Sequence, residues 1–74
     1  MDKTDSINEA AYAVLRGLPH PKFEWVTDKL CLFEFNDERA GGLFEEYKKG
    51  ASVEARSFAA TLAHLKAAMF RSKS

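Results

Sequence analysis

The chain has 74 residues, 46% of them hydrophobic and 30% charged, and its formal net charge at pH 7 is zero. This length allows one domain, and the single cysteine, Cys31, excludes an internal disulfide. Because no apolar run approaches the ~18 residues of a membrane-spanning helix and no secretory signal is visible, we expect a cytoplasmic protein with no membrane contact.

Charge is divided unevenly along the chain. Residues 1–47 carry ten acidic and five basic side chains, whereas residues 48–74 carry one acidic and six basic ones. Such a division favours contact with a charged partner or with a second copy of the chain. A chain of this size buries only about 60% of its unfolded surface, so dimerisation is an expected source of further burial.

The first helix is predicted from about Asp5 to Arg16, after frayed residues 1–3. Ser6 and Glu9 match a capping box, Thr4 is an alternative cap, and Gly17 suits the helix end. The side predicted to be buried contains Ile7, Ala10, Ala11, Val14, Leu15 and Leu18. The side predicted to face solvent contains Glu9, Tyr12, Ala13 and Arg16.

Two strands are predicted after the extended segment Pro19-His20-Pro21, at residues 23–26 and 30–35. A two-residue loop would place Glu24 on the same face as Phe33 and Phe35. A three-residue loop at residues 27–29 instead pairs Trp25 with Cys31, and we predict this register although the loop lacks glycine. It gives an aromatic face of Phe23, Trp25, Cys31, Phe33 and Phe35. It also gives an outer face of Lys22, Glu24, Val26, Leu30, Leu32 and Glu34.

A second helix is predicted from about Glu38 to Lys49, with Asn36 or Asp37 as its cap. Glycines 41 and 42 weaken its first turn by about 1 kcal/mol each relative to alanine, and Gly50 suits its end. Its apolar side contains Ala40, Leu43, Phe44 and Tyr47.

The last helix is predicted from about Val53 to Arg71, with Ser52 as its cap. Its core stripe contains Phe58, Leu62, Leu65 and Met69, widened by Ala55, Ala59, Ala63 and Phe70. Its opposite face contains Arg56, Ala60, His64, Ala67 and Arg71.

These elements predict one α+β domain spanning residues 1–74, in the order α-β-β-α-α. The aromatic face of the hairpin is expected to pack against the first and last helices, while the second helix supports one edge. We expect the last helix to supply most core contacts. Residues 51–53 allow a short third strand, and residues 71–74 are expected to fray.

A series of motifs covers most of the chain. They are Thr4-x-Ser6-x-x-x-Ala10-Ala11, Gly17, Leu32-Phe33-Glu34-Phe35, Tyr47, Gly50, Val53-x-Ala55-Arg56-x-Phe58 and Leu65-Lys66. The series resembles a family of small domains of unknown function found in bacteria and bacteriophages. The resemblance implies a compact α+β domain and brings with it no substrate, cofactor or catalytic residue.

The sequence shows no arrangement typical of catalysis. Cys31 lies in an apolar strand, where burial makes a thiol inert, and His20 and His64 lack neighbouring ligands at metal-binding spacing. The adjacent acids Glu45 and Glu46 point about 100° apart on a helix, which indicates a solvated face. We therefore expect a protein that is not an enzyme and that has no metal or cofactor.

The favoured hypothesis is an interaction module that self-associates as a homodimer or binds a protein partner. Its predicted contact residues lie on the outer face of the hairpin, namely Val26, Leu30, Leu32, Glu24 and Glu34. The alternative is association with nucleic-acid phosphates through Lys48, Lys49, Arg56, Lys66, Arg71 and Lys73. Zero net charge and the shortage of exposed stacking aromatics count against this alternative.

Overall fold

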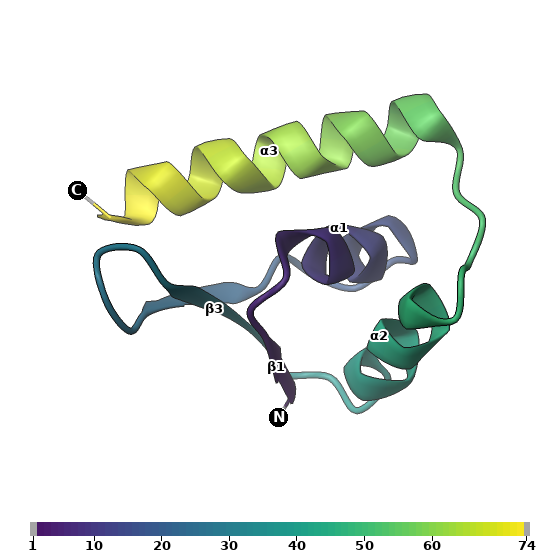
Figure 1. Cartoon of the computed structure of the whole chain (residues 1–74), viewed down its shortest axis with the longest axis horizontal. Coiled ribbons are helices and arrows are strands. Elements are labelled where there is room, and N and C mark those ends of the chain that lie inside the picture. Colours follow the sequence, from purple (N-terminus) through teal and green to yellow (C-terminus); the bar gives the residue numbers. More distant parts are fainter. Residues whose placement is uncertain (1, 74) are drawn as a thin grey trace.

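A computed structural model describes residues 2–73; Met1 and Ser74 lie outside the described residues (Figure 1). The elements in chain order are β1 (Asp2–Thr4), α1 (Ile7–Leu15), β2 (Lys22–Trp25), β3 (Cys31–Phe35), α2 (Ala40–Lys48) and α3 (Ala55–Lys73). The predicted α+β class and the order of the hairpin and the three helices are confirmed. The structure adds one strand, β1, ahead of the first helix.

The three strands form an antiparallel sheet in the order β1-β3-β2. The third strand therefore comes from residues 2–4, which were expected to fray in part, and not from residues 51–53, which link α2 to α3. Tertiary contacts hold β1 in place. The Thr4 hydroxyl donates to the Glu9 carboxylate at 2.7 Å, and the Asp2 carboxylate accepts from the Gly41 N–H at 3.3 Å. A Cβ added to Gly41 would lie 3.3 Å from an Asp2 oxygen, so the Asp2 carboxylate would have to shift by a few tenths of an ångström to make room for it.

The hairpin has the predicted register, with Trp25 opposite Cys31 and Phe23 opposite Phe33. Phe33 and Phe35 are buried on the inner face, and the rings of Phe23 and Phe33 meet edge to face, 5.7 Å apart. Alternation of apolar and polar residues thus decides the register, because a slip by one residue would expose these rings.

Helix α1 lies between α3 and the sheet, and α2 packs beside it (Figure 1). The predicted solvent side of α1 is therefore wrong for Tyr12 and Ala13, which are fully buried. The prediction assumed that one side of α1 faces water. Because α3, the sheet and α2 cover three sides of α1, little of its surface is exposed.

Helix α3 rests mainly on α1 and meets the sheet near its own C-terminal end. Leu65 is fully buried, and Phe58, Leu62 and Met69 are half-buried against the core, as the predicted stripe requires. The predicted widening of the stripe is wrong, because Ala55, Ala59, Ala63 and Phe70 are exposed. Since α3 contacts essentially one helix, only a narrow strip of it is covered. Most of the buried core residues come from α1 and β3 rather than from α3.

The helix ends follow the sequence in part. The Ser6 hydroxyl caps α1 by accepting from the Glu9 N–H at 3.2 Å, and Gly17 and Gly50 have φ values of 104° and 96° after α1 and α2. Asp37 accepts from the Arg39 N–H at 2.8 Å, which closes a turn ahead of α2 rather than capping the helix itself. Residues 71–73, expected to fray, complete α3.

The predicted Ser52 cap of α3 is wrong. The Glu54 carboxylate accepts from the N–H groups of Arg56 at 2.7 Å and Ser57 at 3.1 Å, and so occupies the capping role. These hydrogen bonds favour the ionised carboxylate and lower the pKa of Glu54.

Candidate protein-docking site

An open groove of about 520 Å³ lies between the end of the hairpin and the last turns of α3. We call it the hairpin–helix groove. Its apolar lining consists of Ile7, Trp25, Leu30, Cys31, Phe33, Met69 and Phe70. Its size and its mostly apolar lining are typical of a surface that receives another molecule.

The hairpin loop sets one wall of the groove. The Thr27 hydroxyl accepts from the N–H groups of Lys29 at 3.1 Å and Leu30 at 3.0 Å. These two hydrogen bonds stabilise the three-residue loop although it contains no glycine. The Thr27 side-chain oxygen accepts the N–H groups that a backbone carbonyl would otherwise accept. The loop therefore presents Leu30 in the groove.

Four residues fasten the hairpin to the end of α3, and we call this group the C-terminal clamp. The Trp25 indole N–H donates to the Ser72 hydroxyl at 3.1 Å. The Lys73 ammonium donates to the backbone carbonyl of Asp28 and lies 4.8 Å from the centre of the Trp25 ring. A cation over an indole face is attracted by the ring quadrupole, so the clamp combines a cation–π contact with two hydrogen bonds.

Exposed large hydrophobic side chains gather at the same end of the molecule. Among residues 2–73 they are Val26, Leu30 and Phe70, with exposed fractions of 53%, 39% and 61%. Val26 lies beside Leu30, since its N–H donates to the Leu30 carbonyl at 2.9 Å, and Leu30 and Phe70 both line the groove. Figure 1 shows the hairpin loop beside the C-terminal end of α3. We refer to Val26, Leu30 and Phe70 as the apolar end.

Charged side chains border the groove on both sides. Lys66 and Lys73 stand on α3, whereas Asp5 and Asp28 stand on the N-terminal segment and the hairpin loop, with Lys29 next to Asp28. A partner of the opposite charge pattern would be attracted to this border.

The outer face of the sheet is more charged than the sequence indicated. Lys3 of β1 lies opposite Glu34, which lies opposite Lys22, and the Lys3 ammonium is 2.8 Å from the Glu24 carboxylate. This carboxylate raises the pKa of Lys3 through its hydrogen bond and its charge. Among these charges Leu32 is half-buried.

The predicted docking residues therefore separate into two groups. Val26 and Leu30 belong to the apolar end, and Leu30 lines the groove instead of standing on the outer face alone. Leu32, Glu24 and Glu34 belong to the charged face, where a continuous apolar centre is missing.

Phe70 and three members of the clamp, Trp25, Asp28 and Ser72, were not predicted as site residues, whereas Lys73 was predicted only as a nucleic-acid contact. Phe70 was assigned to the core stripe, but it lies about 140° around the helix from Leu65, on the side of Lys66 and Lys73. This angle can be read from the sequence, and it indicates that Phe70 lies outside the buried stripe. No sequence signal connects Trp25 with Ser72, which lie 47 positions apart.

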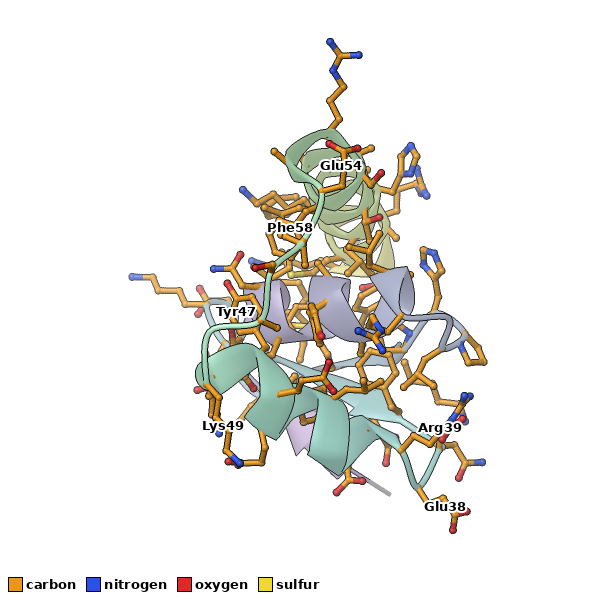
Figure 2. All side chains as sticks on the ribbon, turned by 90° about the vertical axis from the view of Figure 1, so that its right-hand side faces the viewer. Glu38, Arg39, Tyr47, Lys49, Glu54 and Phe58 are labelled. Atoms are coloured by element: carbon orange, nitrogen blue, oxygen red, sulfur yellow. The ribbon has the colours of Figure 1, made fainter. Side chains whose placement is uncertain are left out.

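The predicted nucleic-acid residues do not form one patch. Lys66, Arg71 and Lys73 stand near the C-terminal end of α3, whereas Arg56 stands near its beginning. Arg56 and Lys73 are separated by about 25 Å along the helix axis at 1.5 Å per residue. Lys48 and Lys49 lie at the end of α2, where Figure 2 labels Lys49, and Figure 1 shows this end on the opposite side of the molecule from the C-terminal end of α3. Lys48 lies 3.6 Å from Glu45.

Ion pairs join acidic and basic side chains within the first part of the chain. Arg16 pairs with Glu46 at 3.1 Å and Arg39 pairs with Asp37 at 3.0 Å, in addition to the Lys3–Glu24 pair. The pairs are exposed or partly exposed, so each contributes little to stability. Each pair joins one acid to one base, so the acidic excess of residues 1–47 is unchanged.

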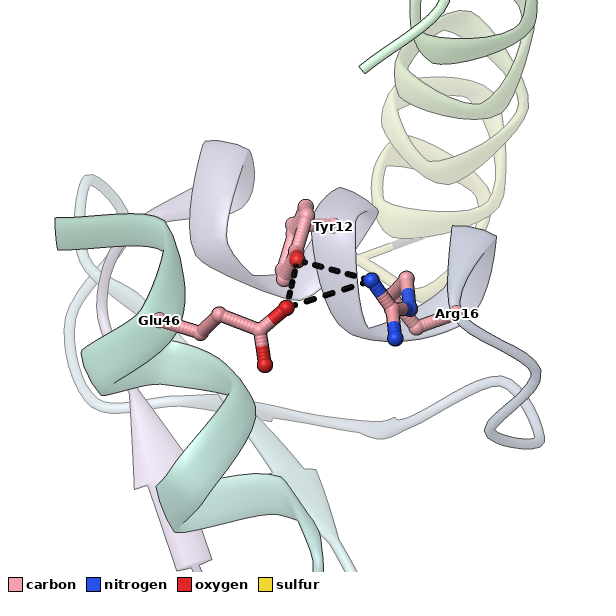
Figure 3. A network of polar contacts seen from close by, with 3 residues as sticks. All are labelled: Tyr12, Arg16 and Glu46. Atoms are coloured by element: carbon pink, nitrogen blue, oxygen red, sulfur yellow. Dashed lines mark hydrogen bonds and ion pairs between the residues drawn. The ribbon is translucent and has the colours of Figure 1, made fainter. Parts of the chain in front are cut away.

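A second polar cluster joins α1 to α2 (Figure 3). The Tyr12 hydroxyl donates to the Glu46 carboxylate, and the Arg16 guanidinium reaches both groups, at 3.3 Å and 3.1 Å. The hydrogen bond to Glu46, followed by burial, raises the pKa of Tyr12, which stays neutral at ordinary pH.

The ring of Tyr12 lies 5.6 Å from that of Tyr47, which stacks on Phe58 of α3 at 6.2 Å. Figure 2 shows Tyr47 and Phe58 one above the other. Tyr12 thus joins α1 to α2 through its hydroxyl and, through Tyr47 and Phe58, belongs to a row of rings that reaches α3. These contacts account for the full burial of Tyr12.

The other chemically reactive side chains form no cluster. Cys31 is buried, and desolvation raises the pKa of its thiol, which disfavours the reactive thiolate. His20 and His64 are both exposed. Over residues 2–73 there is no group of three or more potential metal ligands, and no helix there is long and apolar enough to cross a membrane.

Comparison with known proteins finds no match: no family model, curated protein or solved structure is similar enough to the chain. The resemblance to a family of small bacterial and phage domains therefore stays a prediction. The case for the docking site depends on the geometry of this chain alone.

Proposed function

We propose that the chain is a non-enzymatic interaction module that binds another polypeptide chain through its apolar end and the adjoining hairpin–helix groove. The observation that carries the proposal is the gathering of Val26, Leu30 and Phe70 at one end of the molecule, two of them lining one groove. Exposed hydrophobic side chains scattered singly are ordinary, but a contiguous apolar surface with a charged border is typical of protein contacts.

The surface has the parts that a protein-binding site needs. Phe70 and Trp25 are aromatic, the residue type enriched where binding energy concentrates. The clamp holds Trp25 in position before a partner arrives, which reduces the entropy that binding must remove. The lysines and aspartates that flank this surface would then orient the bound partner more than they increase its affinity.

Site-specific photocrosslinking tests the proposal. A photoreactive phenylalanine analogue is placed at position 70 in one variant and at position 56, also exposed on α3, in the matched control. We expect crosslinks to another polypeptide from position 70, lost when Leu30→Glu is added, and few from position 56. Equal yields from the two positions, or none from position 70, would contradict the proposal.

A further inference from the structure

We infer that the partner in the hairpin–helix groove is a second copy of this chain, related by a twofold axis so that Phe70 of each copy enters the groove of the other. This inference rests on the proposed function and names its partner. It is argued from shape, from charge and from the area that such a contact needs.

Shape is the first argument. A twofold contact uses the same surface on both copies, so that surface must contain both a projection and a depression that accepts it. Phe70 is 61% exposed and projects from α3, and it stands at the border of the groove lined by Trp25 and Leu30. Projection and depression therefore lie side by side on one face, as a self-complementary contact requires.

Charge is the second argument. Lys66 and Lys73 line the groove from α3, whereas Asp5, Asp28 and Lys29 line it from the N-terminal segment and the hairpin loop. The second set has a net charge of −1 and forms the acidic wall. A twofold rotation that brings Phe70 into the partner's groove also brings the α3 wall of each copy over the acidic wall of the other. The side chains of Asp5, Asp28 and Lys66 form no ion pair with residues 2–73, so they are available for contacts between copies.

Area is the third argument. A stable protein contact buries roughly 1,200–2,000 Å² in total, about half of it from each partner. The chain exposes 4817 Å², so each copy would contribute roughly an eighth to a fifth of its surface. Met69 is only half-buried and lines the groove, so a copy docked at the C-terminal half of α3 would bury more of its side chain together with Phe70.

Sedimentation equilibrium over about 5–500 µM tests the inference, because this range detects a micromolar monomer–dimer equilibrium and also shows the dimer mass if association is tighter. Phe70→Glu should weaken the dimer by about a hundredfold, because each substitution acts twice in a twofold contact. Ala60→Glu places the same charge on another exposed side of α3, nearer its beginning, and should change association less than threefold. A purely monomeric wild-type chain, or equal effects of the two substitutions, would overturn the inference.

Charge reversal gives a stricter test. One variant carries Lys66→Glu, and a second carries Asp5→Lys with Asp28→Lys. Each alone should associate weakly, since like charges then face each other in both halves of the contact. An equimolar mixture should recover dimers, because opposite charges then face each other in both halves of the contact. In one half, the glutamate at position 66 of the first variant meets the lysines at positions 5 and 28 of the second. In the other half, Lys66 of the second variant meets Asp5 and Asp28 of the first. Circular dichroism of each variant establishes that it is folded, and a mixture of folded variants that stays monomeric would overturn the inference.

The two proposals fail in different ways. A monomeric chain that still crosslinks from position 70 to a different protein contradicts the second copy and supports the docking surface. Absence of any crosslink from position 70 contradicts both.

Discussion

The indole N–H of Trp25 donates to the hydroxyl of Ser72, which lies 47 positions later, across 3.1 Å. The Ser72 hydroxyl in turn donates to the carbonyl of Met69 at 2.7 Å, so it is held by the last turn of α3. One strand and the far end of the last helix are thereby connected through a single hydroxyl. Together with the contacts of Lys73, it joins the hairpin to α3 beside the hairpin–helix groove, which Trp25 lines.

Ser72→Ala should loosen the C-terminal clamp while leaving the fold intact. The indole N–H loses its acceptor and turns to water, so the emission maximum of the single tryptophan should move to longer wavelength. Because the bond is exposed, stability should fall by only about 0.5–1 kcal/mol in urea unfolding. Ser52→Ala, at an exposed position outside the helix, is the control and should change neither property. Identical spectra for the two variants would contradict the clamp.

Glu54→Ala should remove the cap of α3 and lower the melting temperature by a few degrees at pH 7. Ser52→Ala should have no such effect, since Ser52 does not cap the helix. The two melting temperatures distinguish the observed cap from the one that the sequence favoured.

The contribution of Glu54 should depend on pH in a defined direction. Hydrogen bonds from Arg56 and Ser57 lower its pKa in the folded chain below the ordinary value of 4.5. Stability from the ionised carboxylate is therefore complete above about pH 4.5 and is lost as pH falls through the lower, folded-state pKa. Melting curves of the wild type and Glu54→Ala should converge at low pH; a gap that persists there would refute the explanation.

Leu65→Ala should destabilise the fold more than Leu62→Ala. Leu65 is fully buried, and its truncation should cost about 2–5 kcal/mol, whereas half-buried Leu62 should cost about 1–2 kcal/mol. Chemical denaturation of both variants checks the order. Equal losses would mean that α3 is rotated relative to the described packing.

Nucleic acid should not bind at physiological salt. The basic residues lie towards both ends of α3 and at the end of α2, so few phosphates can be contacted at once. We expect no mobility shift with duplex or single-stranded DNA or RNA at about 150 mM salt. A shift that weakens steeply as salt rises would instead revive the alternative hypothesis.

Local patterns were sufficient for the hairpin. Alternating aromatic residues could place Phe23 and Trp25 with Phe33 on one face only in one register, and the structure has that register. The strand β1 could not be predicted in the same way. It has three residues and almost no apolar pattern, and it is held by pairing with β3 and by the contact of Asp2 with Gly41, both far along the chain.

Tyr12 and Phe70 show the limit of helical periodicity. The period identifies which residues share a side, but it does not say how many sides are covered. Helix α1 has neighbours on several sides and buries Tyr12, whereas α3 packs mainly on α1 along one side and leaves Phe70 outside. The number of neighbours is a property of the tertiary arrangement, so both residues of interest were assigned to the wrong environment.

The position of Lys73 has a practical consequence for work with this protein. Because the chain leaves α3 beside the groove, a purification tag fused after residue 74 would begin within reach of Trp25 and Phe70 and could occupy their surface. A tag ahead of Asp2 begins instead at the β1 edge, on the far side of the sheet from β2. Material for binding studies should therefore be tagged at the amino terminus.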